Sequence, residues 1–117
     1  MRTFCLLARA LAYIEDNLES PLLPDEIAKG CHCSLSALQK TFRYALGLGM
    51  MDYAARRRLT MAAKDLLSGR ERVVDIAYKY QYQSPEVFSR AFSRLWGDTP
   101  RAFCRKWRFS GLYPRIE

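Results

Sequence analysis

Apolar side chains recur every three or four residues along most of the chain, which is the spacing of amphipathic helices. The first run predicts a helix whose apolar stripe consists of Phe4, Leu7, Leu11, Ile14 and Leu18. Pro24 fits the first turn of a short second helix that carries Ile27 and Ala28 and closes at Gly30. No strand pattern competes with these runs, so the sequence predicts an all-α fold.

An internal repeat relates the two halves of the chain. A set of serine, apolar and glycine positions returns fifty residues later: Ser34, Leu38, Phe42, Gly47 and Tyr53 become Ser84, Phe88, Phe92, Gly97 and Phe103. Ile27 and Ala28 return as Ile76 and Ala77, one residue short of that offset. We therefore expect two copies of one helical unit, with a turn before Ser84 that is one residue longer than the turn before Ser34.

Each copy has the order short helix, turn, longer helix and glycine, which is typical of a helix-turn-helix unit. Ser34 and Ser84 are predicted N-caps of the longer helices, and Pro85 occupies a favoured first helical position. The predicted core sides of these helices comprise Leu38, Phe42 and Ala45 in the first copy and Phe88, Phe92 and Leu95 in the second.

A long helix is predicted between the copies over residues 52–68, with Tyr53, Leu59, Ala63, Leu66 and Leu67 on its apolar stripe and Ser68-Gly69 as its stop. Thr99 and Pro100 start a last helix that continues to about Trp107. The expected architecture has seven helices. Two helix-turn-helix subdomains, 1–51 and 69–108, are joined by the linker helix 52–68 and followed by a tail, 109–117.

Charge is the first indication of a partner, because nineteen Lys and Arg residues against twelve Asp and Glu residues give a net charge of +7. Such a surface attracts polyanions, although charge alone does not distinguish a nucleic-acid-binding protein from another basic soluble one. No apolar run reaches the length of a membrane-spanning helix, so we expect a cytoplasmic protein. Cys5, Cys31, Cys33 and Cys104 lie in or beside helical runs and are expected to be reduced.

The polar faces of the two longer helices carry residue types that read DNA bases. The candidates are Ser36, Gln39, Lys40 and Arg43 in the first copy, and Glu86, Ser89, Arg90 and, at the margin, Arg94 in the second. Short polar residues near a helix N-terminus and longer donors behind them suit a recognition helix in the major groove. A single polar face is expected of any soluble helix, but two equivalent faces in one basic chain favour DNA. Lys40 and Arg90 are equivalent under the repeat and are the strongest candidates.

Other charged residues are less specific. Glu86 is a candidate for accepting a hydrogen bond from cytosine N4. Arg101, near the start of the last helix, is a candidate phosphate contact or a solvated charge. Successive side chains of Arg56, Arg57 and Arg58 point in different directions on a helix, and a structural role is favoured for Arg57.

Enzymatic, metal-binding and cofactor-binding functions have little support. His32 is the single histidine, and Cys31-His32-Cys33 is too closely spaced for a usual zinc site, so we interpret it as a partly buried turn. A helical adaptor for protein partners remains the alternative to DNA binding. RNA binding is less favoured, because side chains do not enter the deep groove of A-form RNA and no aromatic platform is evident.

The chain resembles the DNA-binding domain of the AraC/XylS family of bacterial transcription regulators, from the first helix to about Arg105. The second copy carries the family's spaced pattern of Ser84, Phe88, Arg90, Phe92, Gly97, Pro100, Phe103 and Arg105, preceded by Asp75-Ile76-Ala77. The central residues Arg57-Arg58-Leu59, Ala63 and Leu66-Leu67 are similar to the family's linker helix.

This resemblance implies seven helices, of which the third and sixth enter adjacent major grooves of bent double-stranded DNA, and recruitment of RNA polymerase where the protein is an activator. Base-contacting positions of the family match Ser36, Gln39 and Lys40, and Glu86, Val87, Ser89 and Arg90. The chain departs from the MarA, SoxS and Rob type at Ser36, where they carry tryptophan, and at Pro85-Glu86, where they carry two glutamines. Their operator is therefore not assumed to be its own.

Most members of the family add an effector-binding or dimerisation domain, for which this chain has no room. A small-molecule effector is expected only if the full-length protein has such a domain. The apolar tail residues Phe109, Leu112, Tyr113 and Ile116 are interpreted either as the start of a further domain or as a tail that packs back on the core.

Overall fold

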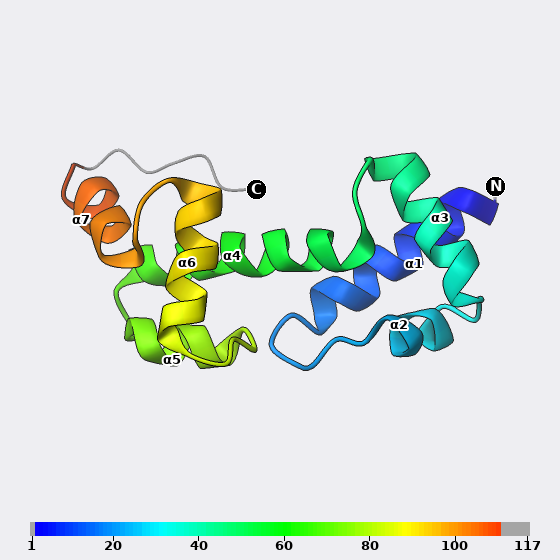
Figure 1. Ribbon diagram of the computed structural model, residues 1–117, viewed down its shortest axis with the longest axis horizontal. Helices are drawn as coiled ribbons and strands as arrows, with labels where there is room; N and C mark the ends of the chain where they lie inside the picture. The colour runs from blue at the N-terminus through cyan, green and yellow to red at the C-terminus, as the bar shows by residue number, and fades with distance from the viewer. Residues whose placement is uncertain (1, 111–117) are drawn as a thin grey trace. The chain divides into compact units, whose positions relative to one another are not determined.

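The computed structural model describes the backbone of residues 2–110 and the side chains of residues 5–107 (Figure 1). Within that part the chain forms seven α-helices and no strand: α1 (Arg2–Asp16), α2 (Pro24–Gly30), α3 (Leu35–Leu46), α4 (Met50–Ser68), α5 (Val73–Lys79), α6 (Pro85–Trp96) and α7 (Pro100–Ser110). The predicted all-α fold is confirmed. The expected tail falls mainly on residues 111–117, outside the described residues.

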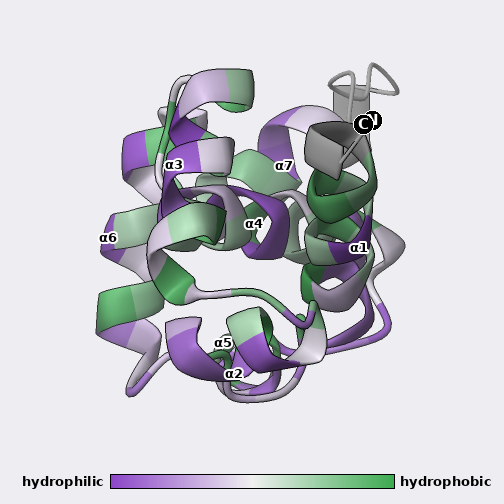
Figure 2. Ribbon diagram, turned by 90° about the vertical axis from the view of Figure 1, so that its right-hand side faces the viewer, coloured by the Kyte–Doolittle hydropathy of each residue, from purple (hydrophilic) through white to green (hydrophobic). Residues whose placement is uncertain are grey.

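The chain divides into two compact units, the first reaching Arg57 and the second beginning at Arg58. The first contains α1, α2, α3 and the beginning of α4, and the second contains the rest of α4 with α5, α6 and α7. Both hydrophilic and hydrophobic residues occur along the helices, as amphipathic packing requires (Figure 2).

The repeat seen in the sequence is a repeat of structure. α3 and α6 each have twelve residues and begin and end fifty positions apart. The hydroxyls of Ser34 and Ser84 accept hydrogen bonds from the amides of Ala37 and Val87 at 3.1 and 3.2 Å, so both predicted N-caps are confirmed. Both helices end at a glycine in the left-handed conformation, Gly47 with φ 74° and Gly97 with φ 84°.

The turns that precede these two helices are also related. His32 and Gln81 have positive φ values of 56° and 71°, although neither is glycine. One residue later, the amides of Cys33 and Tyr82 donate to the carbonyls of Ala28 and Ala77 at 3.1 and 3.0 Å. The second turn then has one more residue, Gln83, before its serine cap, which confirms the predicted difference in turn length.

The core of the first unit is formed by buried residues of α1, α2 and α3, chiefly Ile14, Ile27, Leu38 and Phe42, each fully buried. Tyr53 of α4 contacts the edge of the Phe42 ring, with centroids 5.9 Å apart. Gly30 ends α2 as predicted and lies against α1. A Cβ at this position would lie 2.7 Å from Cε2 of Tyr13, so close packing explains this glycine.

The core of the second unit is an aromatic cluster on α6 and α7. The ring centroid of Phe92 lies 5.7 Å from that of Phe88, 6.3 Å from that of Trp96 and 5.2 Å from that of Phe103. The indole N–H of Trp96 donates to the carbonyl of Leu59 at 3.2 Å. This hydrogen bond satisfies the polar atom of a ring that is half-buried.

Two predicted core residues are exposed. Leu95 is 39% exposed, because the apolar stripe of α6 continues from Phe92 to the half-buried Trp96 at a spacing of four. Ala45 is likewise exposed near the end of α3. Both residues were predicted because they follow a core phenylalanine by three positions. In α6 the core contact is made four positions after Phe92 instead, and α3 has already left the core at Ala45.

Helix ends differ from the predictions by a few residues. α1 ends at Asp16, so Leu18 is buried in the turn beyond the helix. α4 begins at Met50, two residues before the predicted start, and Met50 is itself buried. α7 continues to Ser110, past the expected end near Trp107. Thr99 caps α7 as predicted, because its hydroxyl accepts from the amide of Ala102 at 3.2 Å.

Ion pairs fix parts of the framework. Arg57 binds both carboxylate oxygens of Glu15, at 2.6 and 3.0 Å, which confirms the structural role predicted for it. Lys79 contacts Asp65 at 2.8 Å and Glu71 at 2.6 Å, and the hydroxyl of Tyr80 donates to Asp65 at 2.6 Å.

Across the described residues, every helix is too short or too polar to span a lipid bilayer.

Candidate nucleic-acid interface

The polar face of α3 opposes the side that carries Leu38 and Phe42. Ser34 fixes the start of the helix, and the two buried apolar residues fix its rotation about its own axis. The remaining face is exposed, and it carries all four candidates from the sequence: Ser36, Gln39, Lys40 and Arg43. The packing therefore presents these side chains together on one helix.

The corresponding face of α6 is held in the same way by Ser84, Phe88 and Phe92. Glu86, Arg90 and Arg94 are exposed, Val87 has 37% of its side chain exposed, and Ser89 is half-buried. Lys40 and Arg90 thus occupy the same position on two helices that begin with the same cap. Because α6 has one negative and two positive side chains at its candidate positions, its face is less basic than that of α3.

The candidate cations differ from other basic residues of the chain in their contacts. In the part of the chain whose side chains are described, Lys40, Arg43, Arg90, Arg94 and Arg101 have no ion pair or hydrogen bond to a carboxylate. Arg57, Arg72 and Lys79, by contrast, are paired with Glu15, Asp75 and Asp65. Cations without a partner carboxylate keep their full attraction for an external polyanion.

Arg101 lies on a different element from the other candidates of its unit. It is exposed in the first turn of α7, one residue after the buried Pro100 and two after the cap residue Thr99. It lines a surface cleft together with Ser89 of α6. The structure therefore brings Arg101 and Ser89 to one cleft, whereas Glu86, Arg90 and Arg94 are not among the residues that line it.

Tyr44 is a surface residue that the sequence reasoning did not select. Its side chain is 90% exposed on α3, one turn after Lys40. Under the repeat it is equivalent to Arg94, which was selected. A search for charged residues misses Tyr44. Comparing the two copies position by position would have found this residue.

The Cys31-His32-Cys33 segment forms the turn between α2 and α3, as interpreted from the sequence. Cys31 is buried, and burial, followed by the neighbouring Cys33, raises the pKa of its thiol above the ordinary value. The thiol of Cys33 lies 3.7 Å from the carbonyl of Ala28. All four cysteines are free thiols, and the described residues contain no cluster of potential metal ligands.

Comparisons of sequence and of structure with known proteins agree on one class of protein. The model of a helix-turn-helix domain matches residues 27–106. The transcriptional activator AarP of Providencia stuartii is 35% identical over 98 residues, which cover 84% of this chain and 73% of AarP. The regulatory protein SoxS of Escherichia coli is 36% identical over 90 residues, covering 77% of this chain and 84% of SoxS.

A solved structure resembles the fold closely. It is a transcriptional regulator of Chromobacterium violaceum described as containing an AraC-type DNA-binding domain. It superimposes with a TM-score of 0.83 at 28% identity, over 86% of this chain and 90% of the other. Sequence relatives and the fold neighbour thus agree on a DNA-binding domain of transcription regulators, a class without enzymatic activity.

Proposed function

This chain belongs to the AraC/XylS family of helix-turn-helix transcription regulators, and we propose that it recognises specific duplex DNA by placing α3 and α6 in adjacent major grooves. The observation that carries the proposal is the equivalence of Lys40 and Arg90. Both are exposed cations without an ion pair among the described residues, fifty positions apart on helices with the same serine cap.

Base recognition is assigned to the first two turns of each helix. In α3, Lys40 donates to guanine O6 or N7, Gln39 makes paired hydrogen bonds with adenine, and Ser36 approaches the base edges near the helix start. In α6, Arg90 binds guanine, Glu86 accepts from cytosine N4, and Ser89 supplies a short polar contact. The partly exposed Val87 offers methyl groups to the methyl group of thymine.

Backbone contacts are assigned to the remaining cations. Arg43 and Arg94 lie near the ends of their helices, where longer side chains reach phosphates at the groove margin. Arg101 lies in the first turn of α7, where backbone amides and the guanidinium together attract a phosphate. These contacts hold the protein in register, and the first two turns of α3 and α6 read sequence.

The regulatory output follows the relatives. AarP is named a transcriptional activator, and activation by this chain would act through contact with RNA polymerase. The alignment covers 73% of AarP, so about a quarter of that relative has no counterpart in the match. Transcription activation therefore stays a proposal for this protein.

Selection of bound duplexes from a random library at near-physiological salt tests the proposal. We expect a bipartite motif whose halves lie about one helical turn apart. A motif with a single half would assign sequence readout to one helix and overturn the two-groove mechanism. Absence of enrichment from a folded sample would favour the adaptor function instead.

A further inference from the structure

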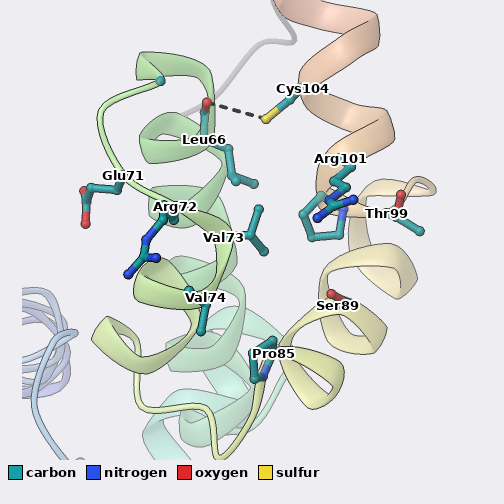
Figure 3. A pocket seen from close by; sticks show the side chains of 12 residues that line it. Leu66, Glu71, Arg72, Val73, Val74, Pro85, Ser89, Thr99, Arg101 and Cys104 are labelled. Atoms are coloured by element: carbon teal, nitrogen blue, oxygen red, sulfur yellow. Dashed lines mark hydrogen bonds between the residues drawn. The ribbon is translucent and has the colours of Figure 1, made fainter.

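The second unit contains a cleft of about 790 Å³ beside its recognition helix. Figure 3 shows Leu66, Val73 and Val74 of α4 and α5 on one side of the cleft. On the other side are Ser89 of α6, the cap residue Thr99, and Arg101 and Cys104 of α7. The thiol of Cys104 lies 3.5 Å from the carbonyl of Leu66 and so bridges the two sides at one end. The cleft falls in the size range of small-molecule sites, roughly 300–1,000 Å³.

The first unit provides an internal comparison. It has a cleft at the equivalent place, lined by Gln39, Gly49, Met50 and Met51, which correspond under the repeat to Ser89, Thr99, Pro100 and Arg101. That cleft has a volume of about 290 Å³ and also includes Arg43 and Asp52. DNA binding by two equivalent units therefore does not account for the additional space in the second.

Three differences in sequence distinguish the larger cleft. Ser89 replaces the longer Gln39, which leaves space beside α6. Val74 and Pro85 add apolar lining that the first cleft lacks. Arg101 replaces Met51 and brings a cation that has no ion pair among the described side chains. The result is a cleft with an apolar wall, the Arg101 cation and the hydroxyls of Ser89 and Thr99. Its lining also includes Glu71 and Arg72, which are already paired with Lys79 and Asp75.

We propose that this cleft binds a small amphipathic anion, an organic carboxylate with an aromatic or branched apolar body, whose carboxylate pairs with Arg101. Val73, Val74 and Pro85 contact the apolar body. A guanidinium and two hydroxyls match a carboxylate in charge and in hydrogen-bond donors. A neutral molecule of the same shape would leave Arg101 without a partner and bind more weakly.

A regulatory role for this cleft rests on the proposed function, because the cleft would then control DNA binding. Ser89 and Arg101 are assigned there to DNA contacts, so a ligand that engages them excludes DNA from the second half-site. The ligand would lower affinity for the duplex by removing one unit's contacts, and the first half-site would be unaffected. The DNA-binding domain would then respond to an effector without a separate sensor domain.

A titration of the intact chain followed by amide NMR shifts tests the site directly, with 4-phenylbutyrate as the probe and 4-phenylbutanol as the neutral probe. Saturable shifts are expected at Thr99 and Arg101, and none at their counterparts Gly49 and Met51. The carboxylate should bind about tenfold more tightly than the alcohol. Absence of saturable shifts, or equal shifts in both units, would overturn the site.

Variants separate charge from shape. Arg101→Gln should remove most of the preference for the carboxylate while the weak affinity for the alcohol persists. Met51→Gln introduces the same side chain at the equivalent place of the first unit and should leave both affinities unchanged. If Arg101→Gln retained the full preference, the proposed pairing of Arg101 with the carboxylate would be wrong.

Competition with DNA is measured separately, on the duplex obtained by selection and at constant ionic strength. 4-Phenylbutyrate should weaken DNA binding at concentrations that saturate the cleft, with sodium chloride as the control for charge screening. Unchanged DNA affinity at saturation would overturn the regulatory inference. If no duplex were selected, the proposed function would fail, but the NMR titration would still decide whether the cleft binds the anion.

Discussion

His32 and Gln81 adopt the same left-handed backbone conformation in equivalent turns, with φ values of 56° and 71°. Such a conformation costs a residue with a Cβ about 1–2 kcal/mol. The hydrogen bonds from the following amides to Ala28 and Ala77 hold both turns in this form. The two turns thus share one geometry although their sequences, CHC and YQY, have no residue in common.

Replacing either residue with glycine should therefore stabilise the fold. His32→Gly and Gln81→Gly relieve the strain but add freedom to the unfolded chain, so each should raise the free energy of unfolding by about 0.5–1 kcal/mol. Chemical denaturation measures the change. Lys29→Gly, in the preceding helix, should lower stability instead, and a similar loss at His32 and Gln81 would contradict the strain.

The serine caps make a second prediction. Ser34→Ala and Ser84→Ala each remove a hydroxyl that accepts from a helix amide and should cost about 1 kcal/mol of unfolding free energy. Ser36→Ala is the matched control, because this exposed serine has no cap bond. It should leave stability unchanged while weakening DNA binding. Equal destabilisation by all three changes would show that the caps contribute nothing specific.

Alkaline pH should destabilise the protein in part through Tyr82. Burial raises the pKa of its phenol above 10.0, although nearby Arg58 opposes the shift. The phenol therefore stays protonated to a higher pH in the folded state than in the unfolded state. The contribution of this difference to the free energy of unfolding is lost as pH rises from about 10 through the folded pKa. Denaturation as a function of pH should show this fall.

Tyr82→Phe keeps the ring that contacts Phe88, at 5.4 Å between centroids, but removes the titrating hydroxyl. The loss of stability above pH 10 should become shallower in this variant. Tyr44→Phe removes the same group from a side chain that is 90% exposed. If both variants changed the pH profile equally, burial of Tyr82 would not be the cause.

Glu86 should determine one base of the second half-site. Glu86→Gln exchanges an acceptor suited to cytosine N4 for an amide suited to adenine, so the preferred base should change at one position only. Removing a negative charge should also raise overall affinity. Glu26→Gln, on an exposed position of α2, is the control for charge alone. An unchanged motif with Glu86→Gln would remove this residue from base readout.

Much of the fold followed from the sequence because its signals are local. The caps at Ser34, Ser84 and Thr99 depend on residues three positions away, and the repeat fixed the difference in turn length between Ala28–Ser34 and Ala77–Ser84. Helix ends were less predictable. α4 starts early because Met50 packs into the core, and packing at a distance leaves no local signature.

The candidate site was only partly predictable. Charge and spacing selected Lys40 and Arg90, whose exposure depends on the helix period alone. Tyr44 was missed because an aromatic residue reads as a core residue, yet α3 leaves it 90% exposed. The cleft at Arg101 could not be foreseen, because its lining comes from four helices and the loop after α4, and its depth depends on which neighbouring side chains are short.

Selection of duplexes by the wild type, Lys40→Ala and Arg90→Ala in parallel tests the central claim most directly. Each variant should weaken binding to the wild-type site by about 1–3 kcal/mol and relax base preference in one half of the motif, a different half for each. Loss of affinity without any change in base preference would make both residues phosphate contacts. Relaxation of the same half by both variants would contradict two equivalent recognition helices.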